Sequence, residues 1–104
     1  MKVYNMKSKR TGRSIPNQFI ANFDNGNQYF QSYYNVIGMK TVDGKIYFNR
    51  ETWNYSRTTA KYRNQWLGED TKTIKAKIKS GEYTLTDLNG LLMPYPPVTR
   101  PEKG

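Results

Sequence analysis

The chain has 104 residues, of which 36% are hydrophobic, and its 17 lysines and arginines outnumber 8 aspartates and glutamates to give a net charge of +9. This length suits one domain with one core, and the positive charge favours nucleic acid or an acidic protein surface as partner. The absence of cysteine and histidine excludes disulfides, thiolate zinc sites, cysteine nucleophiles and the commonest general base. We therefore expect a protein that is not an enzyme and that holds no cofactor and no metal.

Residues 1–15 form a distinct first segment, because they contain five basic residues and no acidic one. We predict a flexible basic arm that lies along phosphates or in a groove and becomes ordered on contact. A solvated terminus without a binding role is one alternative. An edge strand that begins at Val3 and Tyr4 is another.

A first hairpin is predicted around Asn25-Gly26, because alternating hydrophobic residues flank this strong turn signal. A two-residue loop at this position would place Phe19, Phe23 and Phe30 on the same side of the hairpin. We therefore expect one aromatic face and one more polar face.

A second hairpin is predicted around Asp43-Gly44, with Ile46 and Phe48 on its apolar face. The opposite faces of the two hairpins together offer a candidate stacking surface. Tyrosines that half-cover a sheet face without binding anything would give the same pattern. The residues of this candidate surface are Tyr29, Tyr47, Lys40 and Lys45.

Residues 53–68 contain both tryptophans and predict a helix of about three turns, with Ser56 as N-cap and Gly68 as left-handed terminator. Aromatic residues recur here at helical spacing, and we interpret this stripe as core and not as a ligand site. The stripe consists of Tyr55, Tyr62 and Trp66 with Thr59 among them, whereas Arg57, Lys61 and Arg63 lie on other faces.

Residues 71–80 predict a second helix between Asp70 as N-cap and Gly81 as terminator. The alternation of isoleucine and alanine with lysine in this segment would also suit a strand. As a helix, the segment presents a positive stripe that either contacts phosphates or is a solvated face. This stripe consists of Lys72, Lys75 and Lys79.

The C-terminal part combines one more strand with a tail. Residues 82–88 alternate again and predict a fifth strand, and residues 91–104 hold four of the five prolines and predict a polyproline-like tail. We thus predict one α+β domain over residues 16–90, in which two antiparallel hairpins and a C-terminal strand form a sheet of about five strands with two short helices on one face. A small barrel of SH3 or OB type is the alternative.

Three segments within this domain, PNQFIANFDNGNQYFQSYYNVIG, WNYSRTTAKYRNQWLGE and IKSGEYTLTDLNG, resemble small uncharacterised proteins of tailed bacteriophages. The resemblance implies expression in an infected bacterium, where small basic proteins serve DNA transactions, host takeover or counter-defence. It implies no catalytic residue. Since no apolar run approaches the roughly 20 residues that span a bilayer, we expect no membrane partner and a location in the host bacterial cytoplasm.

Three function classes follow from these observations. The leading hypothesis is a non-enzymatic protein that binds nucleic acid through basic and aromatic side chains. The alternative is a counter-defence or host-takeover inhibitor that binds a bacterial protein, either at an acidic surface or at its nucleic-acid site. A metal-dependent nuclease is the third class, and the missing histidines disfavour it. The predicted binding residues are Lys7, Lys9, Arg10, Arg13, Arg57, Lys61, Arg63, Lys72, Lys75 and Lys79.

Overall fold

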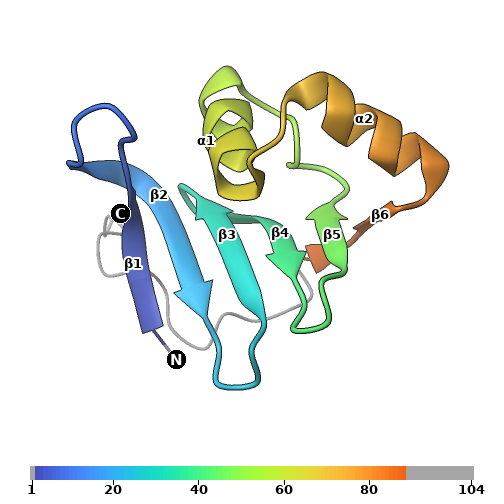
Figure 1. Cartoon of the computed structure of the whole chain (residues 1–104), viewed down its shortest axis with the longest axis horizontal. Helices are drawn as coiled ribbons and strands as arrows, with labels where there is room; N and C mark the ends of the chain where they lie inside the picture. The colour runs from blue at the N-terminus through green and yellow to red at the C-terminus, as the bar shows by residue number, and fades with distance from the viewer. Residues whose placement is uncertain (1, 89–104) are drawn as a thin grey trace.

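The computed structural model describes residues 2–88; residue 1 and residues 89–104, which include the predicted proline-rich tail, lie outside the described part. The described residues form one six-stranded mixed sheet and two helices (Figure 1), so the predicted α+β fold is confirmed. The strands are β1 (Lys2–Lys7), β2 (Ser14–Asn22), β3 (Gln28–Ser32), β4 (Asn35–Lys40), β5 (Ile46–Asn49) and β6 (Tyr83–Thr86).

Strand order in the sheet follows chain order from β1 to β6. Neighbouring strands are antiparallel except β5 and β6, which are parallel because both helices lie between them in the chain. Within the described residues, β1 and β6 occupy opposite edges, so the sheet is open and not the barrel considered as an alternative.

Residues 2–15 do not form the predicted flexible arm. Lys2–Lys7 is the edge strand β1, which pairs with β2 from Lys2 opposite Asn22 to Lys7 opposite Ser14. The six residues between the strands form a closed loop, in which the Ser8 N–H donates to the Arg13 carbonyl at 2.8 Å. The edge strand that the sequence offered as an alternative is therefore the one that forms, and it adds a sixth strand to the predicted five.

Both hairpin loops contain three residues and not the predicted two. The Phe23 N–H donates to the Asn27 carbonyl, and the Thr41 N–H donates to the Lys45 carbonyl, each at 2.9 Å. The last residue of each loop is a glycine with positive φ, as a type I turn followed by a bulge requires. Asn-Gly and Asp-Gly occur in both two-residue and three-residue hairpin loops, and in this protein the three-residue loop forms at both positions.

The longer loops shift the strand register by one residue, which moves side chains to the other face of the sheet. Phe30 now lies opposite Ile20, on the face that the helices cover, and not with Phe19. Tyr29 and Tyr47 both lie opposite Met39 and share the other face. The candidate stacking surface is thereby divided, because Lys40 stands over the Trp66 ring on the helical face at 5.6 Å.

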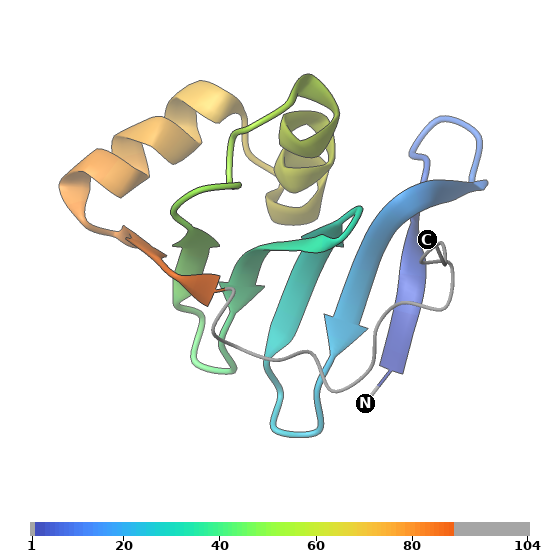
Figure 2. The same cartoon turned by 180° about the vertical axis from the view of Figure 1, so that it is seen from behind.

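The two helices begin and end where the sequence predicted. In α1 (Arg57–Leu67) the Ser56 side chain accepts from the Thr59 N–H, and Gly68 closes the helix with a φ of 71°. In α2 (Thr71–Ser80) Asp70 and Gly81 have the same roles, so this segment is a helix and not the alternative strand. Figures 1 and 2 show both helices on one side of the sheet, α1 near its centre and α2 beside β5 and β6.

Trp66 joins the two parts of the core beneath the helices. Its ring packs against the buried clusters around Phe30 and Phe48, and its Nε1 donates to Gln28 Oε1 at 2.7 Å. A Cβ atom at Gly38 would come within 2.8 Å of this ring, so only glycine lets the tryptophan lie this close to the sheet. The interpretation of the aromatic stripe as core is confirmed for Trp66.

Candidate functional site

The ten predicted binding residues fall into three groups. Four lie on β1 or in the β1–β2 loop, three on α1 and three on α2. Nine of them are exposed, whereas Arg63 is completely buried. The fold brings only some of these exposed side chains close to one another, and we place the candidate site where they meet.

Arg63 is a structural residue and leaves the predicted surface. Its guanidinium donates to the Trp53 carbonyl at 2.9 Å, to Asn54 Oδ1 at 3.0 Å and to Thr71 Oγ1 at 2.9 Å, with further bonds to Asn64. Burial lowers the pKa of Arg63 to about 10. These neutral acceptors tie the segment before α1 to the start of α2. A spacing of four from the buried Thr59 is the sequence signal that places Arg63 on the inner side of the helix.

One side of α1 faces the β1–β2 loop. Arg57, Lys61 and Gln65 follow one another at intervals of four and therefore share this side. Gln65 Nε2 donates to the Lys7 carbonyl at 2.7 Å, and this bond fixes the end of β1 against the helix.

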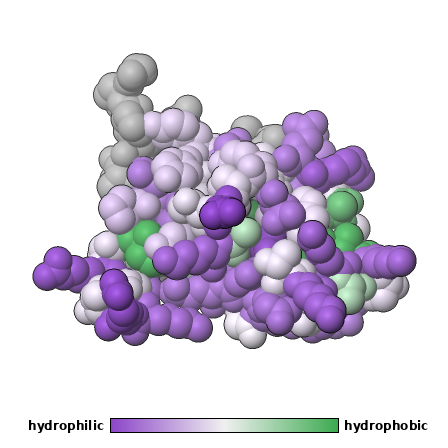
Figure 3. Space-filling model, turned by 90° about the horizontal axis from the view of Figure 1, so that it is seen from above, coloured by the Kyte–Doolittle hydropathy of each residue, from purple (hydrophilic) through white to green (hydrophobic). Residues whose placement is uncertain are grey.

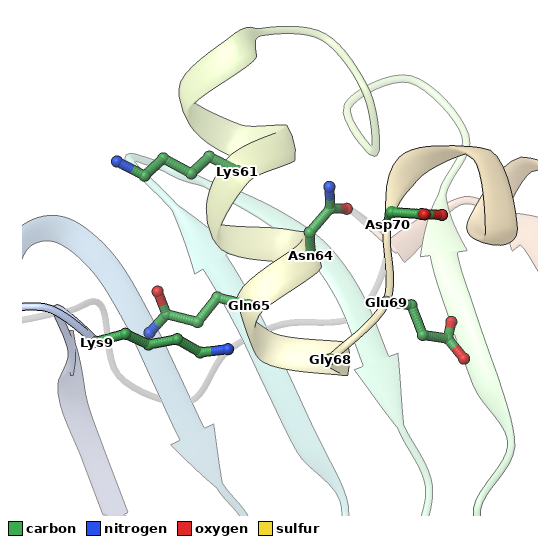
Figure 4. Close-up of a pocket in the computed structure, with 7 residues that line it drawn as sticks. All are labelled: Lys9, Lys61, Asn64, Gln65, Gly68, Glu69 and Asp70. Carbon is green, nitrogen blue, oxygen red and sulfur yellow. The ribbon is translucent and has the colours of Figure 1, made fainter.

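Two neighbouring hollows lie between the loop and α1, with volumes of about 420 and 610 Å³. Lys9, Lys61 and Gln65 line both, so the hollows form one groove, here called the basic groove. Figure 4 shows the smaller hollow, with Lys9 entering from the loop and Lys61, Asn64 and Gln65 projecting from α1. The larger hollow is completed by Ser8, Arg10, Thr11 and Tyr62.

The two ends of the basic groove differ in charge. Among the described residues, the larger hollow is lined by Lys9, Arg10 and Lys61 and by no acidic side chain, whereas Glu69 and Asp70 border the smaller one. An anion is therefore directed towards the loop and away from the α1–α2 connection.

Both acidic side chains at that connection are already engaged. Burial raises the pKa of the Glu69 carboxyl, but hydrogen bonds from Lys77 and Tyr83 outweigh burial and hold this pKa below its ordinary value. A hydrogen bond from the Thr73 backbone N–H likewise lowers the pKa of Asp70, which caps α2. Both groups are charged at neutral pH and serve the fold.

The lysines of α2 do not join the basic groove. Lys72, Lys75 and Lys79 are exposed, yet none of them lines either hollow. Figure 1 places α2 towards β6, whereas the β1–β2 loop lies at the opposite edge of the sheet. The single basic surface expected across both helices is thus divided.

Three exposed tyrosines lie near the start of α1, and one of them, Tyr55, was wrongly predicted to belong to the aromatic core stripe. Tyr33 and Tyr34 form the β3–β4 turn, and Tyr55 precedes the helix. Their exposed fractions are 41%, 49% and 46%. Asn35 Nδ2 donates to Tyr55 Oη at 3.3 Å and thereby links the turn to the segment before α1. We call these three residues the tyrosine cluster.

Tyr33 has an unusual backbone conformation, with a φ of +56°. Its N–H donates to the carbonyl of Asn17, which also has positive φ, at 2.7 Å. Residues with a side chain rarely adopt this left-handed region, and it costs about 1–2 kcal/mol. The sequence did not predict this turn, because Tyr33 and Tyr34 are strand-favouring residues and the turn lacks the glycine that marks the other two hairpins.

Comparison with known proteins places the chain in a family. Residues 1–82 match a model described as a family of unknown function, DUF8033. The chain belongs to DUF8033. No curated protein and no solved structure matches it. The DUF8033 match does not test the resemblance to bacteriophage proteins, which stays a prediction.

Two further properties of the described part limit the site chemistry. Neither α1 nor α2 has the length and hydrophobicity that a membrane crossing requires. Among residues 2–88, no three acidic side chains are grouped as ligands for a metal ion.

Proposed function

We propose that this protein is a non-enzymatic nucleic-acid-binding protein whose basic groove holds the phosphate backbone. The observation that carries the proposal is the meeting of Lys9 and Arg10, from the β1–β2 loop, with Lys61, from α1, at one hollow. These side chains belong to separate elements. The fold brings them together, whereas a run of basic residues in the sequence would be adjacent in any fold.

Phosphate binding accounts for the other side chains of the groove as well. Lysine and arginine neutralise phosphates and release counterions, while serine, threonine and glutamine donate hydrogen bonds to phosphate oxygens. Ser8, Thr11 and Gln65 supply such neutral groups. Arg57, Lys7 and Arg13 are exposed on elements that border the groove and extend its positive field.

The biological setting is part of the proposal. The bacteriophage resemblance supports a role in the cytoplasm of an infected bacterium, where the protein accompanies nucleic acid during infection. An inhibitor that occupies a bacterial protein remains the competing function, and its acidic partner would compete for the same positive groove.

The test compares two double charge reversals that remove the same net charge. Lys9→Glu with Lys61→Glu changes the groove, whereas Lys72→Glu with Lys75→Glu changes exposed positions of α2. Binding is measured by fluorescence anisotropy with labelled DNA and RNA 20-mers at 50 and 200 mM salt, and folding by circular dichroism. We expect the groove variant to bind at least tenfold more weakly and the α2 variant to stay within about threefold of the parent.

Salt provides a second readout. With about four phosphates contacted, the affinity of the parent falls by roughly 50- to 150-fold between the two salt concentrations. Equal losses in both double variants would show that net charge alone matters and would reject the groove. If no nucleic acid binds even at 50 mM salt, the inhibitor hypothesis replaces the proposal. The protein is then used to capture partners from bacterial lysate that has been treated with nuclease, so that only direct protein partners remain.

A further inference from the structure

The tyrosine cluster lies at one end of the α1 side that carries the basic groove. Arg57 is the first residue of α1, and Lys61 follows one turn later at the groove. Tyr55 is two residues before Arg57, and its hydroxyl accepts from Asn35 of β4. Ser32 and Thr59 share a buried hydrogen bond of 2.9 Å, which holds the β3–β4 turn against the first turn of the helix. Aromatic rings, basic side chains and groove therefore follow one another along α1.

The fold itself gives no reason for tyrosine at position 33. The side chain is 41% exposed and belongs to neither core cluster. Its positive φ would suit glycine or asparagine better, and such strained positions are concentrated at ligand-binding sites. A large exposed ring at a strained position is therefore a candidate contact for a ligand.

We propose that the basic groove and the tyrosine cluster form one site for single-stranded nucleic acid, in which phosphates lie along Arg57 and Lys61 and bases stack on the tyrosine rings. This inference rests on the proposed function and adds the class of nucleic acid. Stacking on aromatic side chains needs the open faces of unpaired bases. In a duplex these faces are covered by neighbouring base pairs, and a base must be extruded before it stacks on a protein.

The dimensions of α1 fit a short single strand. Its eleven residues span about 16 Å, which accommodates roughly three to five nucleotides at about 3.4 Å or more per nucleotide. The surface seen from above, towards the helices and the strand turns, is mostly hydrophilic with small apolar patches (Figure 3). This surface suits a polyanion, with contact to the bases restricted to the few exposed rings.

The deciding experiment separates bases from phosphates. The parent is titrated with a single-stranded thymidine 12-mer, with an abasic strand of the same length and charge, and with a duplex of the same length, each at 50 mM salt. A uridine 12-mer distinguishes RNA from DNA. We expect the thymidine or the uridine strand to bind about tenfold or more tightly than the abasic strand and the duplex, as loss of stacking on one or two rings predicts.

Variants then locate the rings. Tyr33→Gly removes a ring and relieves the positive φ, so its melting temperature should equal or exceed that of the parent while its preference for the base-containing strand falls several-fold. Tyr33→Phe keeps an aromatic face and should retain the preference. Tyr4→Ser is the matched control, because Tyr4 is 44% exposed but lies on the edge strand β1.

Failure of this inference is distinguishable from failure of the proposed function. If the abasic strand binds as tightly as the thymidine and uridine strands, or if Tyr4→Ser and Tyr33→Gly lose the same affinity, the stacking site is rejected. The groove still stands in that case, provided that Lys9→Glu with Lys61→Glu weakens binding. If neither strands nor duplex bind, both proposals fall together.

Discussion

α1 and α2 are neighbouring capped helices of eleven and ten residues, and each presents basic side chains to solvent. On α1, Lys61 faces the β1–β2 loop across the basic groove. On α2, Lys72, Lys75 and Lys79 line neither hollow of the basic groove, and among the described residues no wall opposite them is seen. The difference teaches that positive charge on a helix makes a site where another element supplies the opposite wall, and otherwise gives a solvated face.

The inner sides of the two helices differ as much as the outer sides. α1 buries the polar residues Thr59 and Arg63, whereas α2 buries Ile74. α1 therefore adds directed hydrogen bonds from Thr59 and Arg63 to the apolar packing of Trp66, and these bonds fix its rotation and with it the wall of the groove. The buried contact of α2 is the apolar packing of Ile74. Predictions on stability separate these two modes of attachment.

The largest effect is expected for Arg63→Ala. This change removes the hydrogen bonds to Trp53, Asn54 and Thr71 and leaves a cavity where the fully buried arginine side chain lay. We expect the free energy of unfolding, measured with urea, to fall by about 3–5 kcal/mol. Lys61→Ala is the control on the outer side of the same helix and should change it by no more than about 0.5 kcal/mol. A loss below about 1 kcal/mol for Arg63→Ala would contradict the hydrogen-bonded attachment of α1.

A smaller effect is expected for Ile74→Val on α2. Ile74 is fully buried against Phe48 and Tyr83, so removing one methyl group should cost about 0.5–1.5 kcal/mol. Ile78→Val, at a half-buried position of the same helix, should cost less. Binding in the anisotropy assay should be unchanged in both variants, and altered binding would show that α2 also shapes the groove.

The smallest effect concerns pH and the Glu69 carboxylate at the α1–α2 connection. Its pKa in the folded protein lies below the ordinary value, so its ionised form stabilises the fold above about pH 4.3. This contribution is lost as the pH falls through the lower folded pKa. Glu69→Gln should therefore destabilise by no more than about 1 kcal/mol at pH 7 and match the parent near pH 2.

Glu82→Gln is the control for this pH dependence, because Glu82 also lies near Lys77 but its side chain is 60% exposed. It should change stability less than Glu69→Gln at pH 7, and both variants should match the parent near pH 2. Urea unfolding of the three proteins between pH 2 and 7 makes the comparison. A Glu69 effect that persists unchanged at pH 2 would show that the carboxylate charge is not its cause.

Local sequence chemistry was sufficient to predict the helices and the fold class. Ser56, Asp70, Gly68 and Gly81 mark the ends of α1 and α2, because caps depend on side chains within one turn. Hairpin positions were predicted for the same reason. The strand registers were not predicted, because Asn25-Gly26 and Asp43-Gly44 fit both two-residue and three-residue loops. The packing of the strands beneath Trp66 depends on residues that are distant in sequence, so local patterns do not show it.

The candidate site was predicted only in part. The basic residues Lys9, Arg10 and Lys61 were predicted, but their convergence depends on the bond from Gln65 to the Lys7 carbonyl, across 58 positions of sequence. Arg63 was assigned to the surface because of its place beside the basic side of α1, and its burial follows from acceptors supplied by other segments. The edge strand β1 was predicted to be part of an arm because residues 1–15 have five basic residues and no acidic one, but lysine at both ends is also common in edge strands.

The β1–β2 loop is self-contained in its hydrogen bonding. Ser8 Oγ accepts from the N–H groups of Arg10 and Thr11, and the Ser8 carbonyl accepts from Gly12. Residues 8–13 contribute no side chain to the two core clusters, so changes of length or sequence in this loop should cost little folding stability. In the proposed site, the loop wall of the groove can therefore be redesigned while the α1 wall and the core stay as they are.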